Sequence, residues 1–188
     1  MEIRGNDLAR MALDELAAVL GRVDETAMNH ACRMIAEAGR TGVFGCGREA
    51  LQIKGFAMRL FHLGLPVAVV GDVTMPPLGP GDVFLVTAGP GELATVLALM
   101  KIAREAGARV LLLTAQAESS AAKMADFTLL VPAQTLADDQ GASATSVLPM
   151  GSVYEGALFV LFEVMVLKLK EMLGASLEAM RARHTNME

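Results

Sequence analysis

The stretch FLVTAGPGELATVLALM, residues 84–100, contains the transition that decides the fold. A continuous apolar run ends at a glycine turn, and an apolar segment with helical spacing follows it. This order is typical of α/β domains in which the turn and the N-terminus of the helix bind an anion. Ala88, Pro90 and Leu93 stand where the hydroxyl side chains of a phosphate loop are expected. Each lost hydrogen bond to a charged group costs about 1.5–3 kcal/mol, so we predict a phosphate site that is preserved in shape and weakened in chemistry.

The same alternation of apolar runs and helical segments extends over the middle of the chain. Because the runs are continuously apolar, they are predicted to be parallel strands that are buried on both faces. They are TGVFGC (41–46), PVAVVG (66–71), DVFLVTA (82–88), RVLLLTA (109–115) and FTLLVP (127–132). Helices are predicted over 49–63, 92–106 and 119–125, which makes a three-layer αβα sandwich with right-handed crossovers.

Helices are also predicted on both sides of this alternation, in a chain that forms a single domain. Its parts are N-terminal helices in 1–39, an α/β core in 40–131, a loop in 132–149 and C-terminal helices in 150–188. The segment 157–169 is apolar on nearly every side. A chain of 188 residues has difficulty enclosing such a helix, and this favours an oligomer.

Composition excludes several classes of function. The net charge of −5, one Tyr and no Trp argue against a general nucleic-acid binder. Cys32 and Cys46 form no disulfide framework and no zinc pattern, so no metal is expected. No cofactor is expected either. The longest apolar run, 157–167, is broken by Glu163 and is too short to span a bilayer, and the N-terminus lacks the apolar core of a signal peptide. We expect a cytoplasmic protein with no membrane partner.

A second glycine-rich turn, GCGREA in residues 45–50, follows the first predicted strand. It fits the dinucleotide pattern G-x-G-x-x-A, and the next strand leads to Asp72. The match is weak, because Arg48 and Glu49 are bulky and charged where a pyrophosphate would approach. Dinucleotide binding therefore stays open as the weaker alternative.

Four segments together resemble one known family. GCGREALQIKGFAMRLFHLG resembles the family's G-x-G-R-S turn and its F-A-M-R-L-x-H-L-G helix, and FLVTAGPGELATV resembles S-G-S-G-E-T. LPMGSVYEGA resembles P-x-G-S-x-F-E, and RHTNME resembles R-H-x-N-L-E. The chain resembles the SIS (sugar isomerase) domain nearly end to end, and within it the 6-phospho-3-hexuloisomerases. The resemblance implies a five-stranded parallel sheet of Rossmann-like topology in a homotetramer. It also implies isomerisation of a 3-hexulose 6-phosphate to fructose 6-phosphate, at sites that lie between subunits.

The resemblance also implies roles for three titratable residues. Glu155 matches the family's catalytic Glu, and a carboxylate whose pKa burial brings toward neutrality can move a proton between adjacent carbons through an enediolate. His184 matches the C-terminal His that reaches a neighbour's pocket, where it would shuttle a proton or bind a hydroxyl group. His62 either serves the site or caps its helix.

The glycine turns supply the predicted substrate contacts. Arg48 would neutralise the phosphate or the developing enediolate, whereas Glu49 stands where the family has a Ser and would repel a dianion. Thr87 and Thr114, at strand ends, offer hydroxyl groups that partly compensate for those that are lost. The full predicted set is Gly45, Gly47, Arg48, Glu49, Thr87, Ala88, Gly89, Gly91, Glu92, Leu93, Thr114 and Ser152. These departures leave a second hypothesis open, a protein that binds or senses a sugar phosphate without turning it over.

Overall fold

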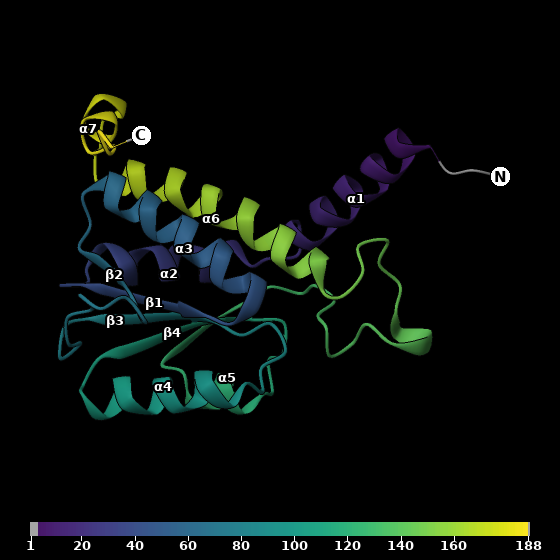
Figure 1. Cartoon of the computed structure of the whole chain (residues 1–188), viewed down its shortest axis with the longest axis horizontal. Coiled ribbons are helices and arrows are strands. Elements are labelled where there is room, and N and C mark those ends of the chain that lie inside the picture. Colours follow the sequence, from purple (N-terminus) through teal and green to yellow (C-terminus); the bar gives the residue numbers. More distant parts are fainter. Residues whose placement is uncertain (1–3, 188) are drawn as a thin grey trace.

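The structure, a computed structural model, describes residues 4–187 and is a three-layer α/β sandwich around one parallel sheet (Figure 1). The five predicted strands are all present and adjacent in the order β2-β1-β3-β4-β5. They are β1 (Thr41–Gly45), β2 (Val67–Val69), β3 (Val83–Thr87), β4 (Arg109–Thr114) and β5 (Phe127–Leu130). Every neighbouring pair is parallel, so the predicted fold class is confirmed.

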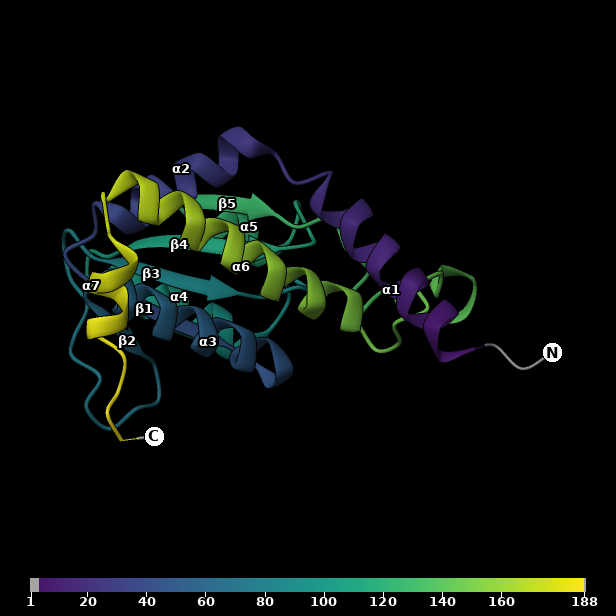
Figure 2. The same cartoon turned by 90° about the horizontal axis from the view of Figure 1, so that it is seen from above.

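The apolar runs form this sheet because alternate side chains of each central strand enter different layers. The helices over one face of the sheet are α2 (Glu25–Ala36), α3 (Gly47–Leu63) and α6 (Ser152–Met172), and those over the other face are α4 (Ala94–Glu105) and α5 (Ser120–Met124) (Figures 1 and 2). In β3, Leu85 packs under the first set of helices, whereas Phe84 and Val86 pack toward the second. Beyond the carboxyl end of β3, the N-terminal ends of α3, α4 and α6 line one cavity.

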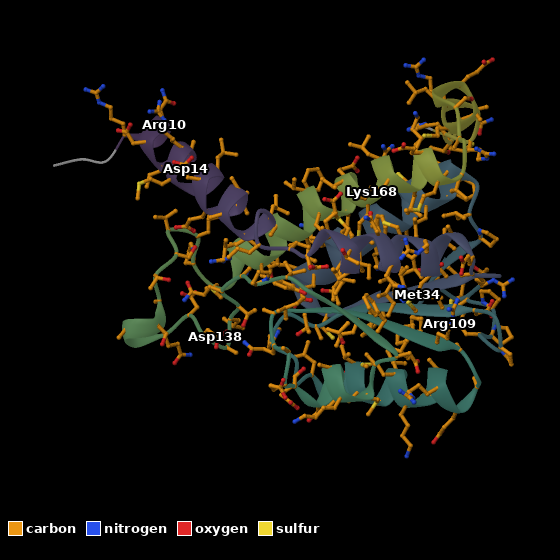
Figure 3. All side chains as sticks on the ribbon, turned by 180° about the vertical axis from the view of Figure 1, so that it is seen from behind. Arg10, Asp14, Met34, Arg109, Asp138 and Lys168 are labelled. Carbon is orange, nitrogen blue, oxygen red and sulfur yellow. The ribbon has the colours of Figure 1, made fainter. Side chains whose placement is uncertain are left out.

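Two further helices lie at the ends of the molecule. The first helix, α1 (Gly5–Leu20), leans on the start of α6 and projects away from the sheet, and α7 (Leu177–Ala182) packs against α3 (Figures 1 and 2). Figure 3 shows Arg10 and Asp14 pointing outward from α1, whereas Met34 lies between α2 and the sheet. The chain between β5 and α6 is irregular apart from the short 3-10 helix Gly141–Ser143.

Residues 4–187 leave one side of α6 exposed. Its inner face buries residues such as Leu158, Phe162 and Met165, but Phe159 and Leu167 remain 60% and 66% exposed. This agrees with the expectation that a single chain cannot enclose the helix. Within residues 4–187, no helix is both long enough and apolar enough to cross a membrane.

Candidate active site

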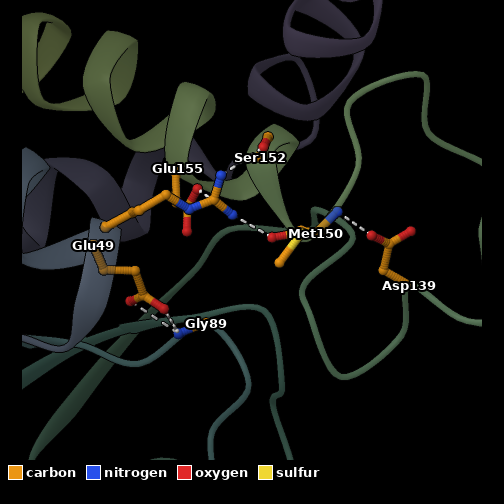
Figure 4. A network of polar contacts seen from close by, with 7 residues as sticks. Glu49, Gly89, Asp139, Met150, Ser152 and Glu155 are labelled. Carbon is orange, nitrogen blue, oxygen red and sulfur yellow. Dashed lines mark hydrogen bonds and ion pairs between the residues drawn. The ribbon is translucent and has the colours of Figure 1, made fainter.

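Arg48 joins the beginning of α3 to the beginning of α6. The chain leaves β1 through Cys46, an extended residue that precedes α3, and Gly47, whose φ is 56°. From the first turn of α3, the Arg48 guanidinium donates to Ser152 Oγ at 2.8 Å and to the carbonyl oxygen of Met150. The same group pairs with Glu155 Oε2 at 3.0 Å (Figure 4). One arginine therefore binds three groups at or just before the N-terminus of α6.

Glu155 is a shielded carboxylate with one charged partner. Its side chain is 17% exposed and lies in the first turn of α6. Burial raises its pKa, and the charge and hydrogen bond of Arg48 oppose part of that rise. The carboxylate lines a cavity of about 320 Å³ formed by α3, the turn after β3 and the segment before α6. A group placed and tuned in this way can act as a general base.

Glu49 lies inside the molecule and not on its surface. Its carboxylate accepts a hydrogen bond from Thr87 Oγ1 at 2.6 Å, and the amide of Gly89 lies 3.1 Å and 3.2 Å from its two oxygens. The Thr87 hydroxyl also lies 3.1 Å from the hydroxyl of the buried Tyr154. Burial raises the pKa of Glu49, the bonds from Thr87 and Gly89 lower it, and the nearby Glu155 raises it again.

The segment before α6 has an unusual backbone conformation. Met150 has a φ of 57° and is the single non-glycine residue with positive φ among residues 4–187; Gly151 follows at 75°. A Cβ at Gly151 would lie 2.7 Å from the backbone nitrogen of Leu136, so this close approach requires glycine. Asp139 accepts a hydrogen bond from the Met150 amide (Figure 4).

The turn after β3 has the predicted shape, but its polar groups face the chain itself. Thr114 Oγ1 donates to the carbonyl oxygen of Gly89 at 3.2 Å, which supports the turn from β4. Glu92 is exposed and accepts a hydrogen bond from the Ser120 amide at 2.6 Å, so its side chain joins α5. Pro90 and Leu93 present apolar surface to the cavity.

The two predicted catalytic histidines lie together, but at the opposite end of α3. His62, near the C-terminus of α3, and His184, after α7, have ring centroids 5.3 Å apart. Arg48 and His62 are fourteen positions apart on α3, which corresponds to about 20 Å along the axis. A single chain therefore does not bring either histidine to Glu155. Arg183 donates to the carbonyl oxygen of His62 at 3.1 Å and fixes this end of α3.

Comparison with known proteins agrees with the geometry. The SIS domain family matches residues 34–160, which is more than half of the chain. The chain belongs to the SIS domain family. It is 32% identical over 183 residues to the 3-hexulose-6-phosphate isomerase of Methylomonas aminofaciens, which covers 97% of this chain and 99% of that protein. It is 34% identical over 191 residues to the enzyme of the same name from Mycobacterium gastri, covering 100% and 95% of the two chains.

A solved structure of similar fold comes from Methanococcus jannaschii. That protein, for which a function of 3-hexulose-6-phosphate isomerase has been inferred, superposes with a TM-score of 0.82. It is 22% identical and covers 96% of this chain and 98% of its own. At that identity, the match supports the SIS fold of this chain.

Two residues that differ from the SIS motifs contact the same threonine. Glu49 replaces the Ser of G-x-G-R-S, and Tyr154 replaces the Phe of P-x-G-S-x-F-E. In the structure, both side chains contact the Thr87 hydroxyl. The sequence identified Glu49 and Thr87 separately and missed Tyr154 altogether. Its departure from the motif, one residue before Glu155, was the signal that could have identified it.

The dinucleotide pattern is divided between two places on this SIS domain. Gly47 and Arg48 line the cavity beside Glu155, whereas the exposed Asp72 lines a different hollow together with Lys54 and Met58. The guanidinium of Arg48 is already engaged by the start of α6. No observation therefore favours the dinucleotide alternative.

Proposed function

We propose that this protein is a phosphosugar isomerase of the 3-hexulose-6-phosphate isomerase type, with Glu155 as its base. The observation that carries the proposal is the Glu155 carboxylate, which is shielded in a cavity and lies 3.0 Å from the Arg48 guanidinium. The names of its relatives and the length over which they match support the same assignment. The proposed steps are proton transfers, so we expect no cofactor.

The proposed reaction moves a carbonyl group to the adjacent carbon. Glu155 removes the proton from C2 of the 3-hexulose 6-phosphate, and the electron pair moves onto the carbonyl oxygen at C3, which gives an enediolate. The proton then returns from Glu155 to C3, while the proton of the C2 hydroxyl passes to the oxygen on C3, so that C2 carries the new carbonyl and C3 a hydroxyl group. The positive charge of Arg48 stabilises the negative charge that develops on the enediolate oxygen. Burial that raises the pKa of Glu155 makes this carboxylate a better proton acceptor.

Proton exchange tests this assignment directly. In heavy water, the wild-type protein should introduce deuterium into fructose 6-phosphate at C3, the carbon next to the carbonyl that the proposed reaction deprotonates. Glu155→Gln should slow that exchange by about 100-fold to 10,000-fold, the usual contribution of a general base. Glu163→Gln is the matched control, because Glu163 lies on the same helix and also pairs with an arginine, Arg59, at 3.1 Å. Full exchange in the Glu155 variant would remove the assignment.

We further propose that the active assembly is a homotetramer in which a partner's His184 completes the site. Large apolar side chains on α3 and α6 remain exposed, among them Leu51, Met58, Phe159 and Leu167. The separation of the histidines from Glu155 within one chain supports a site between subunits. A mixture of Glu155→Gln and His184→Ala subunits should recover part of the activity that each variant has lost. No recovery after subunit exchange, or a monomer by light scattering, would contradict the proposal.

A protein that binds a sugar phosphate without turnover is the second candidate. The engaged amide of Gly89 and the replaced hydroxyl groups favour it. In that case fructose 6-phosphate would raise the unfolding temperature, and no deuterium would enter the sugar. Any measured turnover excludes this candidate.

A further inference from the structure

The Gly89 amide, in the turn where a phosphosugar is expected to bind, is already bonded to an anion that belongs to the chain. The Glu49 carboxylate lies 3.1 Å and 3.2 Å from that amide and accepts from Thr87 at 2.6 Å. A backbone amide and a threonine hydroxyl are the donors that a phosphate oxygen would use in such a turn. Figure 4 shows Glu49 reaching from α3 to Gly89. The carboxylate thus stands in for a bound anion.

The space beside this amide is also filled. A Cβ at Gly89 would lie 2.9 Å from two ring carbons of Tyr154 and 3.2 Å from Glu49 Oε1. The Tyr154 ring is buried, and the helix α6 holds it in place. A phosphate can therefore reach Gly89 only if the Glu49 side chain leaves.

The charges around Glu49 disfavour such an exchange. The second carboxylate of the cavity, Glu155, faces Glu49 from α6. The nearby cation, Arg48, directs its guanidinium to Ser152, Met150 and Glu155 at the start of α6. A dianion at Gly89 would meet a carboxylate without a cation of its own, which is repulsive in a site shielded from water.

We propose that Glu49 is the specificity-determining residue of this cavity, and that it excludes phosphate from Gly89 in favour of hydroxyl groups. A carboxylate accepts hydrogen bonds and donates none, so it selects the hydroxyl-bearing end of a sugar. The inference rests on the proposed function and refines it. The sugar lies in the cavity with hydroxyl groups toward Glu49, and any phosphate lies away from this turn.

Binding of inorganic phosphate, measured by calorimetry, tests the inference independently of turnover. Glu49→Ser removes the internal anion and restores a hydroxyl group, so it should bind inorganic phosphate at least tenfold more tightly than the wild type. Glu49→Gln removes the charge at nearly constant shape and should change the affinity in the same direction. Glu118→Ser is the control, because it removes one exposed negative charge from the turn after β4 and should leave the affinity unchanged. Thermal unfolding identifies the variants that fold.

Each outcome decides one question. A phosphate affinity within twofold of the wild type in folded Glu49→Ser would overturn the inference. An equal gain in Glu118→Ser would overturn it too, because net charge alone would then explain the effect. If the wild type fails to introduce deuterium into fructose 6-phosphate while Glu49→Ser gains phosphate affinity, the proposed reaction fails and the role of Glu49 stands.

Discussion

Replacing Thr87 by Val removes one hydroxyl from the centre of the buried network and leaves the volume of the side chain almost unchanged. Thr87 is fully buried, and its hydroxyl contacts both Glu49 and Tyr154. The substitution therefore isolates the polar contribution of this network to stability. If Glu49 is held as an internal anion, loss of the Thr87 hydroxyl should destabilise the folded protein at neutral pH.

The contacts set the magnitude. A hydrogen bond to a charged acceptor contributes about 1.5–3 kcal/mol, and a buried hydroxyl that loses its partner costs about 1–3 kcal/mol. The first applies to the 2.6 Å bond to Glu49, and the second to the 3.1 Å contact with Tyr154. The methyl group that replaces the hydroxyl recovers about 0.8 kcal/mol. Thr87→Val should therefore lower the free energy of unfolding by roughly 2–5 kcal/mol, a large part of the 5–15 kcal/mol typical of a domain.

Urea unfolding at neutral pH and fixed protein concentration measures this loss. Thr87→Ser keeps the hydroxyl and should lose much less, and Thr95→Val, at an exposed position of α4, should change stability by less than about 0.5 kcal/mol. A double-mutant cycle with Glu49→Gln should give a coupling of about 0.5–3 kcal/mol. A loss below about 1 kcal/mol for Thr87→Val, or additive single changes in the cycle, would refute the reasoning.

Three further predictions follow from the same region. Burial raises the pKa of both Glu49 and Glu155, so the folded chain binds more protons than the unfolded chain at pH values just above the ordinary Glu pKa. The free energy of unfolding should therefore fall as pH rises through that window. In urea titrations at several pH values, this free energy should depend less steeply on pH in Glu49→Gln than in the wild type. In the same urea assay, Gly151→Ala should destabilise by more than about 2 kcal/mol, because it adds a clash with a backbone nitrogen to the cost of positive φ. Gly174→Ala, in open space at φ 61°, should lose only about 1–2 kcal/mol. Arg48→Lys keeps the charge but not the planar fork, so the deuterium exchange rate should fall about 10-fold to 100-fold; an unchanged rate would show that charge alone suffices.

Much of the architecture follows from local pattern. The apolar runs around β1, β3 and β4 predicted buried parallel strands, and the structure places strands there. The glycine turns also lie at the predicted strand ends, since a sharp turn and a following helix leave a strong signal in neighbouring residues. Glu155 was identified by the motif around it, and its place in the first turn of α6 agrees with that motif.

The partners of the charged residues could not be predicted in the same way. As a first-turn helix residue, Glu49 could equally point into solvent, and its inward direction depends on Gly89, which is 40 positions away in the chain. The bond from Arg48 to Ser152 joins residues 104 positions apart. Motif resemblance grouped His62 with Glu155, but α3 separates them by its own length within one chain.

By itself, the sequence determined which segments are strands and which turns contain glycine, because these properties depend on local spacing and composition. Its resemblance to a family motif indicated the candidate base. The tertiary structure alone decided that Glu49 accepts a hydrogen bond from the Gly89 amide and that Arg48 forms an ion pair with Glu155. It also decided that the histidines lie together at the far end of α3 in the single chain. A buried carboxylate needs donors from other elements to offset its lost hydration, and the packing of α3 and α6 on β3 is what supplies them.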